Sequence, residues 1–153
     1  MKEITISELG AIFAETLAAV VRTVSGFSLE VLPEKEDAGF NELVGVMSLT
    51  GNKRGMVFIS AARGDMRTLC SFITGTPINE VTPEDMEDCL GELVNMTAGS
   101  TKLQLNDTDF LLTLSWPFVI KGRDMSISTK NKVRVTSRTL SNGEISMGIK
   151  VVY

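Results

Sequence analysis

The sequence predicts an α+β fold, within the broad α/β class: a largely antiparallel sheet of about six or more strands packed with two long helices and one short helix. Two long stretches carry apolar residues at helical spacing. Several segments of strand length are rich in Val and Ile and are bounded by turn residues. Because no linker or low-complexity stretch interrupts the chain, we expect residues 1–153 to form a single domain.

The first long helix is predicted to begin near Thr5 or Ser7, because either side chain can cap a helix, and to end at Gly26. Between these points apolar residues recur at the spacing of one helix face. They are Leu9, Ile12, Phe13, Leu17, Val20, Val21 and Val24. This stretch therefore predicts a helix that buries one side.

Strand-like segments follow, separated by polar and Gly-containing turns. The predicted strands are residues 29–32, 42–49 and 55–60. A polar loop at 33–39 separates the first two, and the turn at 50–54 joins the last two as a hairpin. A short helix is predicted at 65–75, and Thr76-Pro77 breaks the chain after it. We expect its inward face to consist of Met66, Leu69, Cys70, Phe72 and Ile73.

The second long helix is predicted at residues 81–102, where several N-terminal signals coincide. Thr82 can cap the helix, Pro83 suits its first position, and Thr82 with Asp85 forms a variant capping box. The negative charges of Glu84 and Asp85 are favourable near the positive end of the helix dipole. We expect the core face of this helix to be Met86, Cys89, Leu90, Leu93 and Thr97.

The opposite face of this helix is unusual for a solvated surface. Asn95 is a poor helix former at a mid-helix position, and Glu92 precedes it by three residues, which places their Cβ atoms about 5–6 Å apart. Small residues lie about one turn away on either side: Gly91, Ala98 and Gly99. A partner could therefore approach the backbone closely. The alternative interpretation is an ordinary exposed helix face on which Gly91 serves helix packing.

The rest of the chain is predicted to form strands. They are residues 110–115, 117–121, 124–129, 132–139 and 143–152. Ser141-Asn142-Gly143 is a strong signal for the turn between the last two. These segments complete the predicted sheet.

The composition argues against several classes of function. The net charge of −4 disfavours a broad nucleic-acid surface. No apolar run approaches the roughly 20 residues that span a bilayer, and the N-terminal acids do not suit a signal peptide. We therefore expect a cytoplasmic protein that binds no membrane. The chain contains no histidine and no Cys-x-x-Cys pair, so we predict no metal site.

The two cysteines, Cys70 and Cys89, each lie among apolar residues of a predicted helix. We interpret them as reduced, buried and small hydrophobic side chains. A cysteine-based enzyme is the competing interpretation, in which Cys70→Ser or Cys89→Ser would abolish activity. Because no histidine is present to activate a thiol, this alternative is disfavoured.

Asp88, Glu92, Asn95 and Gly99 lie within a stretch whose core reads Leu-Gly-Glu-Leu-Val-Asn-Met-Thr-Ala-Gly. This stretch resembles the signature helix of the CheX/CheC family of chemotaxis phosphatases, which dephosphorylate the response regulator CheY. The resemblance extends to the apolar first helix, to residues 45–60 with their Gly-Asn-Lys-Arg-Gly turn, and to Trp-Pro-Phe-Val-Ile-Lys-Gly at 116–122. A single Glu-x-x-Asn motif is the CheX pattern, whereas CheC proteins typically have two.

The resemblance implies a phosphatase that hydrolyses the aspartyl phosphate of a CheY-like receiver domain. Asn95 would orient the attacking water, and Glu92 would dock on the lysine of the receiver. No cofactor is expected on this chain, because the phosphorylated receiver supplies the Mg²⁺. The residues expected to contact the partner are Asp88, Gly91, Ala98 and Gly99. The family further implies a homodimer whose sheet edges meet, and the Val/Ile-rich strands at 133–139 and 143–152 would be an aggregation risk as open edges.

A second function stays open: a non-catalytic module that binds receivers or joins an assembly in two-component or chemotaxis signalling. Retention of both Glu92 and Asn95 favours the enzyme.

The resembled family also implies a pseudo-two-fold repeat. Aligning Gly26 with Gly99 places Ala19 and Arg22 opposite the two motif residues, so the first helix would be a silent copy of the second.

Overall fold

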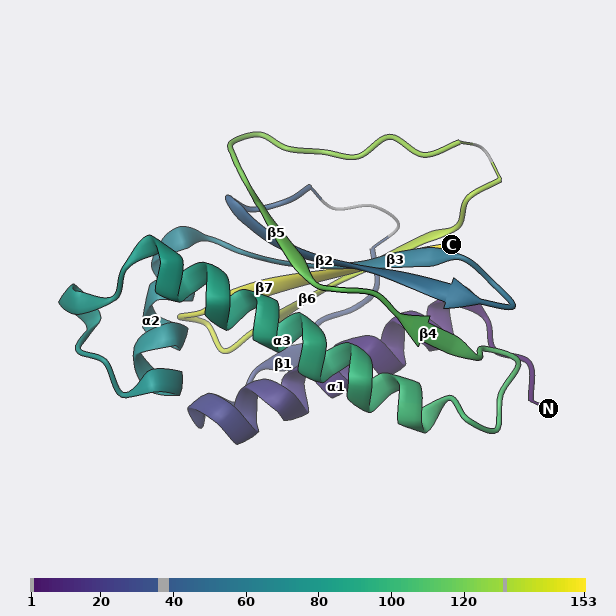
Figure 1. Ribbon diagram of the computed structural model, residues 1–153, viewed down its shortest axis with the longest axis horizontal. Helices are drawn as coiled ribbons and strands as arrows, with labels where there is room; N and C mark the ends of the chain where they lie inside the picture. The colour runs from purple at the N-terminus through teal and green to yellow at the C-terminus, as the bar shows by residue number, and fades with distance from the viewer. Residues whose placement is uncertain (1, 36–38, 131) are drawn as a thin grey trace.

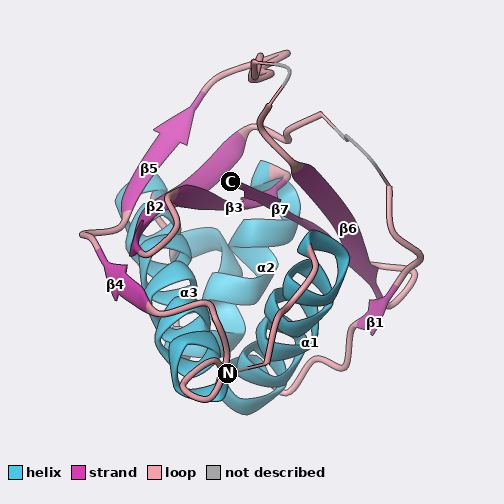
Figure 2. Ribbon diagram, turned by 90° about the vertical axis from the view of Figure 1, so that its right-hand side faces the viewer, coloured by secondary structure: helices cyan, strands magenta, loops and turns pink. Residues whose placement is uncertain are grey.

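The computed structural model of the protein describes residues 2–35, 39–130 and 132–153. A seven-stranded antiparallel sheet forms one layer, and three α-helices cover one of its faces (Figures 1 and 2). In chain order the elements are α1 (Ile6–Ser25), β1 (Glu30–Val31), β2 (Leu43–Gly51), β3 (Gly55–Ala61), α2 (Arg63–Thr74), the 3₁₀ turn η1 (Ile78–Glu80), α3 (Pro83–Gln104), β4 (Leu112–Leu114), β5 (Phe118–Lys121), β6 (Val135–Ser141) and β7 (Ser146–Val152). The predicted α+β class is therefore confirmed.

The strand order is nearly symmetric about the central pair β3 and β7. It runs β1-β6-β7-β3-β2-β4, and β5 pairs with the other end of β2. Each half contributes one long helix, α1 or α3, and the two helices lie side by side beneath the sheet (Figure 2). This arrangement is the pseudo-two-fold repeat that the family resemblance implied.

The two halves can also be aligned at the starts of their long helices. Both long helices begin with a capping box, formed by Thr5 with Glu8 in α1 and by Thr82 with Asp85 in α3. If these caps are aligned, Glu15 and Ala18 fall opposite Glu92 and Asn95, and the predicted partners Ala19 and Arg22 are displaced by one turn. The first helix thus retains an acid but has no amide, so the motif is complete only in α3.

The predicted strand at 124–129 is wrong, because residues 125–130 pair with no strand in the described parts of the chain. Their alternation is nevertheless real. Met125 and Ile127 are half-buried, whereas Ser126 and Ser128 are exposed. The apolar pair packs against a small cluster on the sheet face opposite the helices, formed by Val44, Val46, Phe58 and Val152. Residues 122–130, which follow β5, therefore arch over this face (Figure 1) and cover it without adding a strand.

The predicted inward face of the short helix α2 is confirmed for three residues and wrong for Phe72. Met66, Leu69 and Cys70 are fully buried, but the side chain of Phe72 is 61% exposed. Its ring meets the edge of Phe27 with 4.7 Å between centroids, so it packs at the rim of the helical layer and not within the core. Of the polar loop predicted at 33–39, residues 36–38 lie outside the described residues.

Neither of the two long C-terminal strands is an open edge of the sheet. β6 is flanked by β1 and β7, and β7 by β6 and β3, so neither long C-terminal strand lies at an edge. The edges are the very short strand β1 and the strands β4 and β5. Short edge strands limit unwanted pairing. The argument for a homodimer from long, exposed edge strands therefore does not hold, and homodimerisation stays a prediction.

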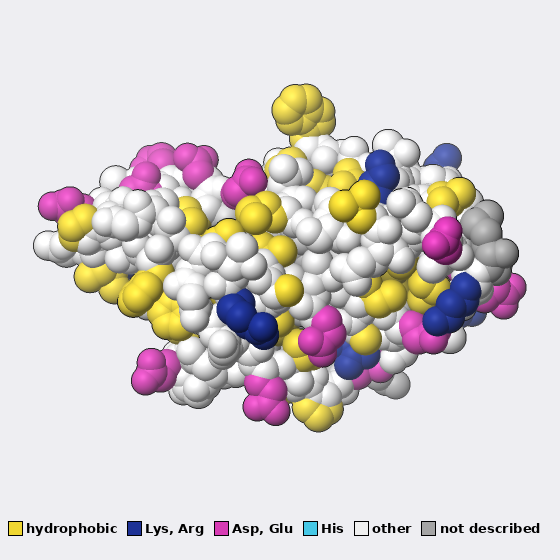
Figure 3. Space-filling model, turned by 90° about the horizontal axis from the view of Figure 1, so that it is seen from below, with side chains coloured by type: hydrophobic (Ala, Val, Ile, Leu, Met, Phe, Trp, Pro, Cys, Tyr) yellow, Lys and Arg dark blue, Asp and Glu magenta, His cyan; other side chains and the backbone are white. Residues whose placement is uncertain are grey.

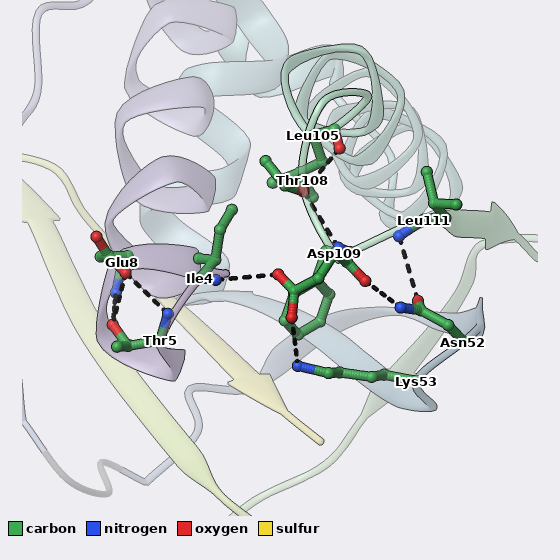
Figure 4. Close-up of polar contacts among 10 residues, drawn as sticks. Ile4, Thr5, Glu8, Asn52, Lys53, Leu105, Thr108, Asp109 and Leu111 are labelled. Atoms are coloured by element: carbon green, nitrogen blue, oxygen red, sulfur yellow. Dashed lines mark hydrogen bonds and ion pairs between the residues drawn. The ribbon is translucent and has the colours of Figure 1, made fainter. Parts of the chain in front are cut away.

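Asp109 joins three parts of the chain just after α3 (Figure 4). Its carboxylate accepts hydrogen bonds from the backbone N–H of Ile4 and from Nζ of Lys53, each at 3.0 Å. Its backbone carbonyl accepts a hydrogen bond from the side-chain amide of Asn52, whose oxygen accepts one from the N–H of Leu111. The C-terminal end of α3 is thereby tied to the β2–β3 turn and to the N-terminal segment.

We expect Asp109→Asn to destabilise the protein in a pH-dependent way. The hydrogen bond from Lys53 lowers the pKa of the Asp109 carboxyl below its ordinary value. A carboxyl with a lowered native pKa stabilises the fold above the unfolded pKa of about 4, and this contribution is lost as the pH falls through the native pKa. Thermal unfolding should give a lower Tm for the variant at neutral pH and a smaller difference in acid.

A suitable control for this prediction is Asp107→Asn, which removes an exposed carboxylate two residues away. The control should leave the pH profile of Tm close to that of the unchanged protein. A Tm difference for Asp109→Asn that is the same at all pH values would contradict the role of its charge.

Candidate functional site

Helix α3 is fixed at its N-terminus by the predicted capping box. The N–H of Asp85 donates to Oγ1 of Thr82 at 3.1 Å, and the N–H of Thr82 donates to a carboxylate oxygen of Asp85 at 2.9 Å. Pro83 occupies the first helical position, where its missing N–H costs nothing. The sequence thus encodes this helix start locally.

The inner face of α3 lies unusually close to β2. A Cβ added at Gly45 would lie 2.5 Å from Cγ2 of Val94 and 3.2 Å from Cγ of Leu90, so only glycine permits this approach. On the side toward β5, Nζ of Lys121 contacts Oε1 of Glu87 at 2.6 Å. Together with the Asp109 contacts behind its C-terminus, these interactions tie α3 to the sheet along its length.

Glu92 and Asn95 project from the outer face of α3. Both side chains are exposed, and they lie three residues apart on one helix face. Within the described residues neither makes a hydrogen bond or an ion pair with another part of the chain. Because their polar groups are not used by the fold, they are available to a partner.

The two glycines beside them have no packing role within this chain. Apart from the neighbouring residues and backbone of α3 itself, a Cβ added at Gly91 or Gly99 would meet no atom within 4 Å among the described residues. The interpretation of Gly91 as a helix-packing residue is therefore wrong. A glycine in a helix interior costs roughly 1 kcal/mol relative to alanine, and here no contact inside the protein offsets that cost.

The other predicted contact residues divide between the surface and the core. Asp88 is exposed and lies on the same helix face, toward the N-terminus of α3. We call Asp88, Glu92 and Asn95 the outer stripe of α3. Ala98 is fully buried, which corrects its assignment to the partner surface. It lies about 60° around the helix axis from Asn95, on the side of Val94 and Thr101, so its methyl group packs into the core.

The site carries a strongly acidic surface at one end. The acids of α3 lie in its first half: Glu84, Asp85, Glu87, Asp88 and Glu92. In the view onto the helical layer, acidic side chains gather at the upper left (Figure 3). Over the described ranges, no group of three or more potential ligands is arranged to hold a metal ion. The exposed stripe therefore suits a partner that brings its own positive charge.

A groove between α1 and α3 borders the same surface and was not predicted. It has a volume of about 400 Å³, and Ala19, Val20, Met96 and Ser100 are among the residues that line it. Met96 directly follows Asn95 in the chain. Sequence reasoning had no signal for this groove, because its walls come from two helices whose relative placement is set by tertiary packing.

Exposed apolar side chains lie along the edge of the sheet formed by β4 and β5. Trp116 is 89% exposed and lies between these two strands. Leu111, just before β4, is also exposed, and so are Phe118 and Ile120 of β5. Phe118 and Ile120 lie on the sheet face opposite the helices, because Val119 between them packs against the helix-side core. Exposed patches of large apolar residues commonly mark interaction surfaces.

Among the residues described, no helix is both long and apolar enough to cross a bilayer.

The fold and the site together define a class of protein. A seven-stranded antiparallel sheet with helices on one face is a fold that this chain shares with a solved CheC-like superfamily protein from Shewanella, which is 19% identical with a TM-score of 0.83, over 97% of this chain and 98% of that one. The family model described as "Chemotaxis phosphatase CheX" matches residues 43–139, which is more than half of the chain, so the protein belongs to the CheX family. No curated protein sequence matches the chain significantly.

Solved structures share this fold over nearly the whole chain. CheX from Vibrio vulnificus is 21% identical with a TM-score of 0.83, and the match covers 94% of this chain and 97% of that one. CheX from Desulfovibrio desulfuricans is 20% identical with a TM-score of 0.82 and the same coverage, 94% and 97%. A CheX–CheY–BeF3–Mg²⁺ complex from Borrelia burgdorferi matches at 17% identity and a TM-score of 0.74, covering 93% and 96%. At these identities the likeness establishes a common fold.

Proposed function

We propose that this protein is a phosphatase that hydrolyses the aspartyl phosphate of a CheY-like receiver domain. The observation that carries the proposal is the outer stripe of α3, where an acid and an amide stand free between two glycines with open space around them. Membership of the CheX family supports the reaction. The Borrelia burgdorferi complex, in which CheX is bound to CheY, supports the class of partner.

In the proposed mechanism the chain contributes positioning. Acyl phosphates are labile, and the receiver itself supplies Mg²⁺ and a lysine that neutralise the phosphoryl oxygens. What remains is to hold a water in line with the phosphorus atom. The carboxamide oxygen of Asn95 can accept a hydrogen bond from that water while staying neutral and non-nucleophilic. Such positioning contributes on the order of 10²–10³ in rate.

Glu92 and its neighbours would set the register of the complex. The carboxylate of Glu92 lies one turn from Asn95 and would pair with the receiver lysine, with Asp88 adding negative charge on the same stripe. Gly91 and Gly99 would let the receiver backbone approach α3, because no side chain rises there. The groove between α1 and α3 would take part of the receiver beside the phosphoryl pocket.

Incubation with phosphorylated receivers from the same cell tests the function. A substoichiometric amount of the protein should accelerate phosphate release from at least one receiver through many turnovers. A non-catalytic binding module would leave release unchanged, or would slow it in proportion to the amount of complex. Failure to accelerate release from every receiver of the host would contradict the phosphatase.

We also propose that the protein works in the cytoplasm as a homodimer that pairs along the edge of β4 and β5. The exposed side chains of Trp116, Phe118 and Ile120 support this edge as the contact, because burying them would remove apolar surface from water. Sedimentation should then give a dimer that Trp116→Ala weakens.

A further inference from the structure

Two buried thiols meet where α2 packs against α3. Cys70 is fully buried and Cys89 is 8% exposed, and both are free cysteines. Their Sγ atoms are only 2.9 Å apart. A disulfide requires a sulfur–sulfur distance of about 2.0 Å, so the two atoms would have to approach by less than about 1 Å.

We infer that Cys70 and Cys89 form a site of reversible oxidation, at which a low-molecular-weight disulfide converts the two thiols into an intramolecular disulfide within the native fold. The bond would join α2 to α3 directly. This inference does not depend on the proposed phosphatase, because it concerns the inner side of α3 and not its outer stripe.

The difference in exposure sets the order of the two steps. The thiolate of Cys89 attacks one sulfur of the small disulfide, which forms a mixed disulfide and releases one small thiolate. The thiolate of Cys70 then attacks the Cys89 sulfur and expels the second small thiolate. Two protein thiols are oxidised, one small disulfide is reduced to two thiols, and the two protein protons pass to the two leaving thiolates.

The fold allows the small movement that the bond requires. α3 is held by the close contact with Gly45 and by the ion pair between Glu87 and Lys121. α2 lies at the end of the helical layer, where Phe72 is mostly exposed. We therefore expect α2 to move toward α3. Cys89 lies about 120° around the helix axis from Asn95, so the outer stripe should keep its geometry.

The reaction should be slow at neutral pH. Burial, followed by the neighbouring Cys70 sulfur and the charges of Asp85 and Asp88, raises the pKa of the Cys89 thiol to about 12. The thiolate is the attacking species, and only a small fraction of Cys89 is ionised under these conditions. The pair is therefore suited to a gradual response to prolonged oxidation.

Oxidised glutathione is the probe for this inference, applied to the folded, full-length protein. After prolonged incubation, intact mass under non-reducing conditions should fall by about 2 Da per chain, and dithiothreitol should restore it. Closing a loop between residues 19 apart in the chain should raise Tm by about 5–10 °C. Two free thiols after incubation, or a glutathione adduct that never resolves, would overturn the inference.

Single alanine variants test the order of attack. In Cys70→Ala the less deeply buried thiol, that of Cys89, remains, and its glutathione adduct should accumulate because no second thiol resolves it. In Cys89→Ala the remaining thiol is fully buried and should stay unmodified for as long as the protein is folded. Equal modification of both variants, or chains linked to one another in the unchanged protein, would contradict the mechanism. Thermal unfolding of each variant verifies that it is folded.

Discussion

Replacing Asn95 with alanine should lower catalysed phosphate release from a phosphorylated receiver by about 10²–10³-fold, with little change in binding. The amide is exposed and makes no hydrogen bond within the described part of this chain, so its removal takes nothing from the fold. Alanine is the better helix former by up to about 0.7 kcal/mol. The variant should therefore be as stable as the unchanged protein, or slightly more stable. Single-turnover release measured beside receiver affinity separates the two effects.

Two further variants make this result specific to the amide. Asn95→Asp keeps the shape of the side chain but adds a negative charge near the phosphoryl group, so it should also lose activity. Asn106→Ala removes another exposed amide, just beyond the C-terminal end of α3, and should leave the rate unchanged. If Asn95→Ala releases phosphate at the original rate, the water-orienting role is wrong. If it abolishes binding instead, Asn95 contributes to docking and not to the chemical step.

The features that could be predicted from sequence are those that depend on local interactions. Both long helices begin at capping boxes whose partners are three residues apart, so Thr5 and Thr82 mark their starts without any tertiary information. The turn at Asn142-Gly143 is equally local, because Gly143 adopts a positive φ of 90° that glycine tolerates. The order of elements and the outward position of Glu92 and Asn95 follow from such signals.

The features that were missed depend on contacts between distant segments. Residues 124–129 alternate as a strand does, but whether they find a strand partner is decided by the position of β5 and β6. Ala98 was assigned to the wrong side of α3 because its neighbours in sequence are small, and only packing against the sheet reveals that it is buried. The groove between α1 and α3 has the same origin.

Gly91→Ala should make the protein more stable and less active at the same time. Outside the adjoining residues and backbone of α3, no atom of the described chain lies within 4 Å of the added methyl group, so the substitution removes the cost of a helix-interior glycine without creating a clash. The gain should be roughly 1 kcal/mol in the free energy of unfolding, which corresponds to about 2–4 °C in Tm. In the complex, the same methyl group would stand between α3 and the receiver backbone. A displacement of about 1 Å can cost up to 10²-fold in rate, and we expect a loss of at least about tenfold in kcat/KM.

Gly64→Ala in α2 is the matched control, because Gly64 is also a helical glycine with open space around an added Cβ. It lies on another helix, so it should leave phosphate release unchanged. Gly99→Ala, one turn beyond Asn95, should behave as Gly91→Ala does. A Gly91→Ala protein that gains stability and keeps full activity would contradict close approach of the receiver to α3. Loss of stability would instead contradict the open space around Gly91. A gain in stability together with a loss of activity would show that the fold itself does not need a glycine at position 91. The glycine would then be explained by close contact with a partner outside this chain.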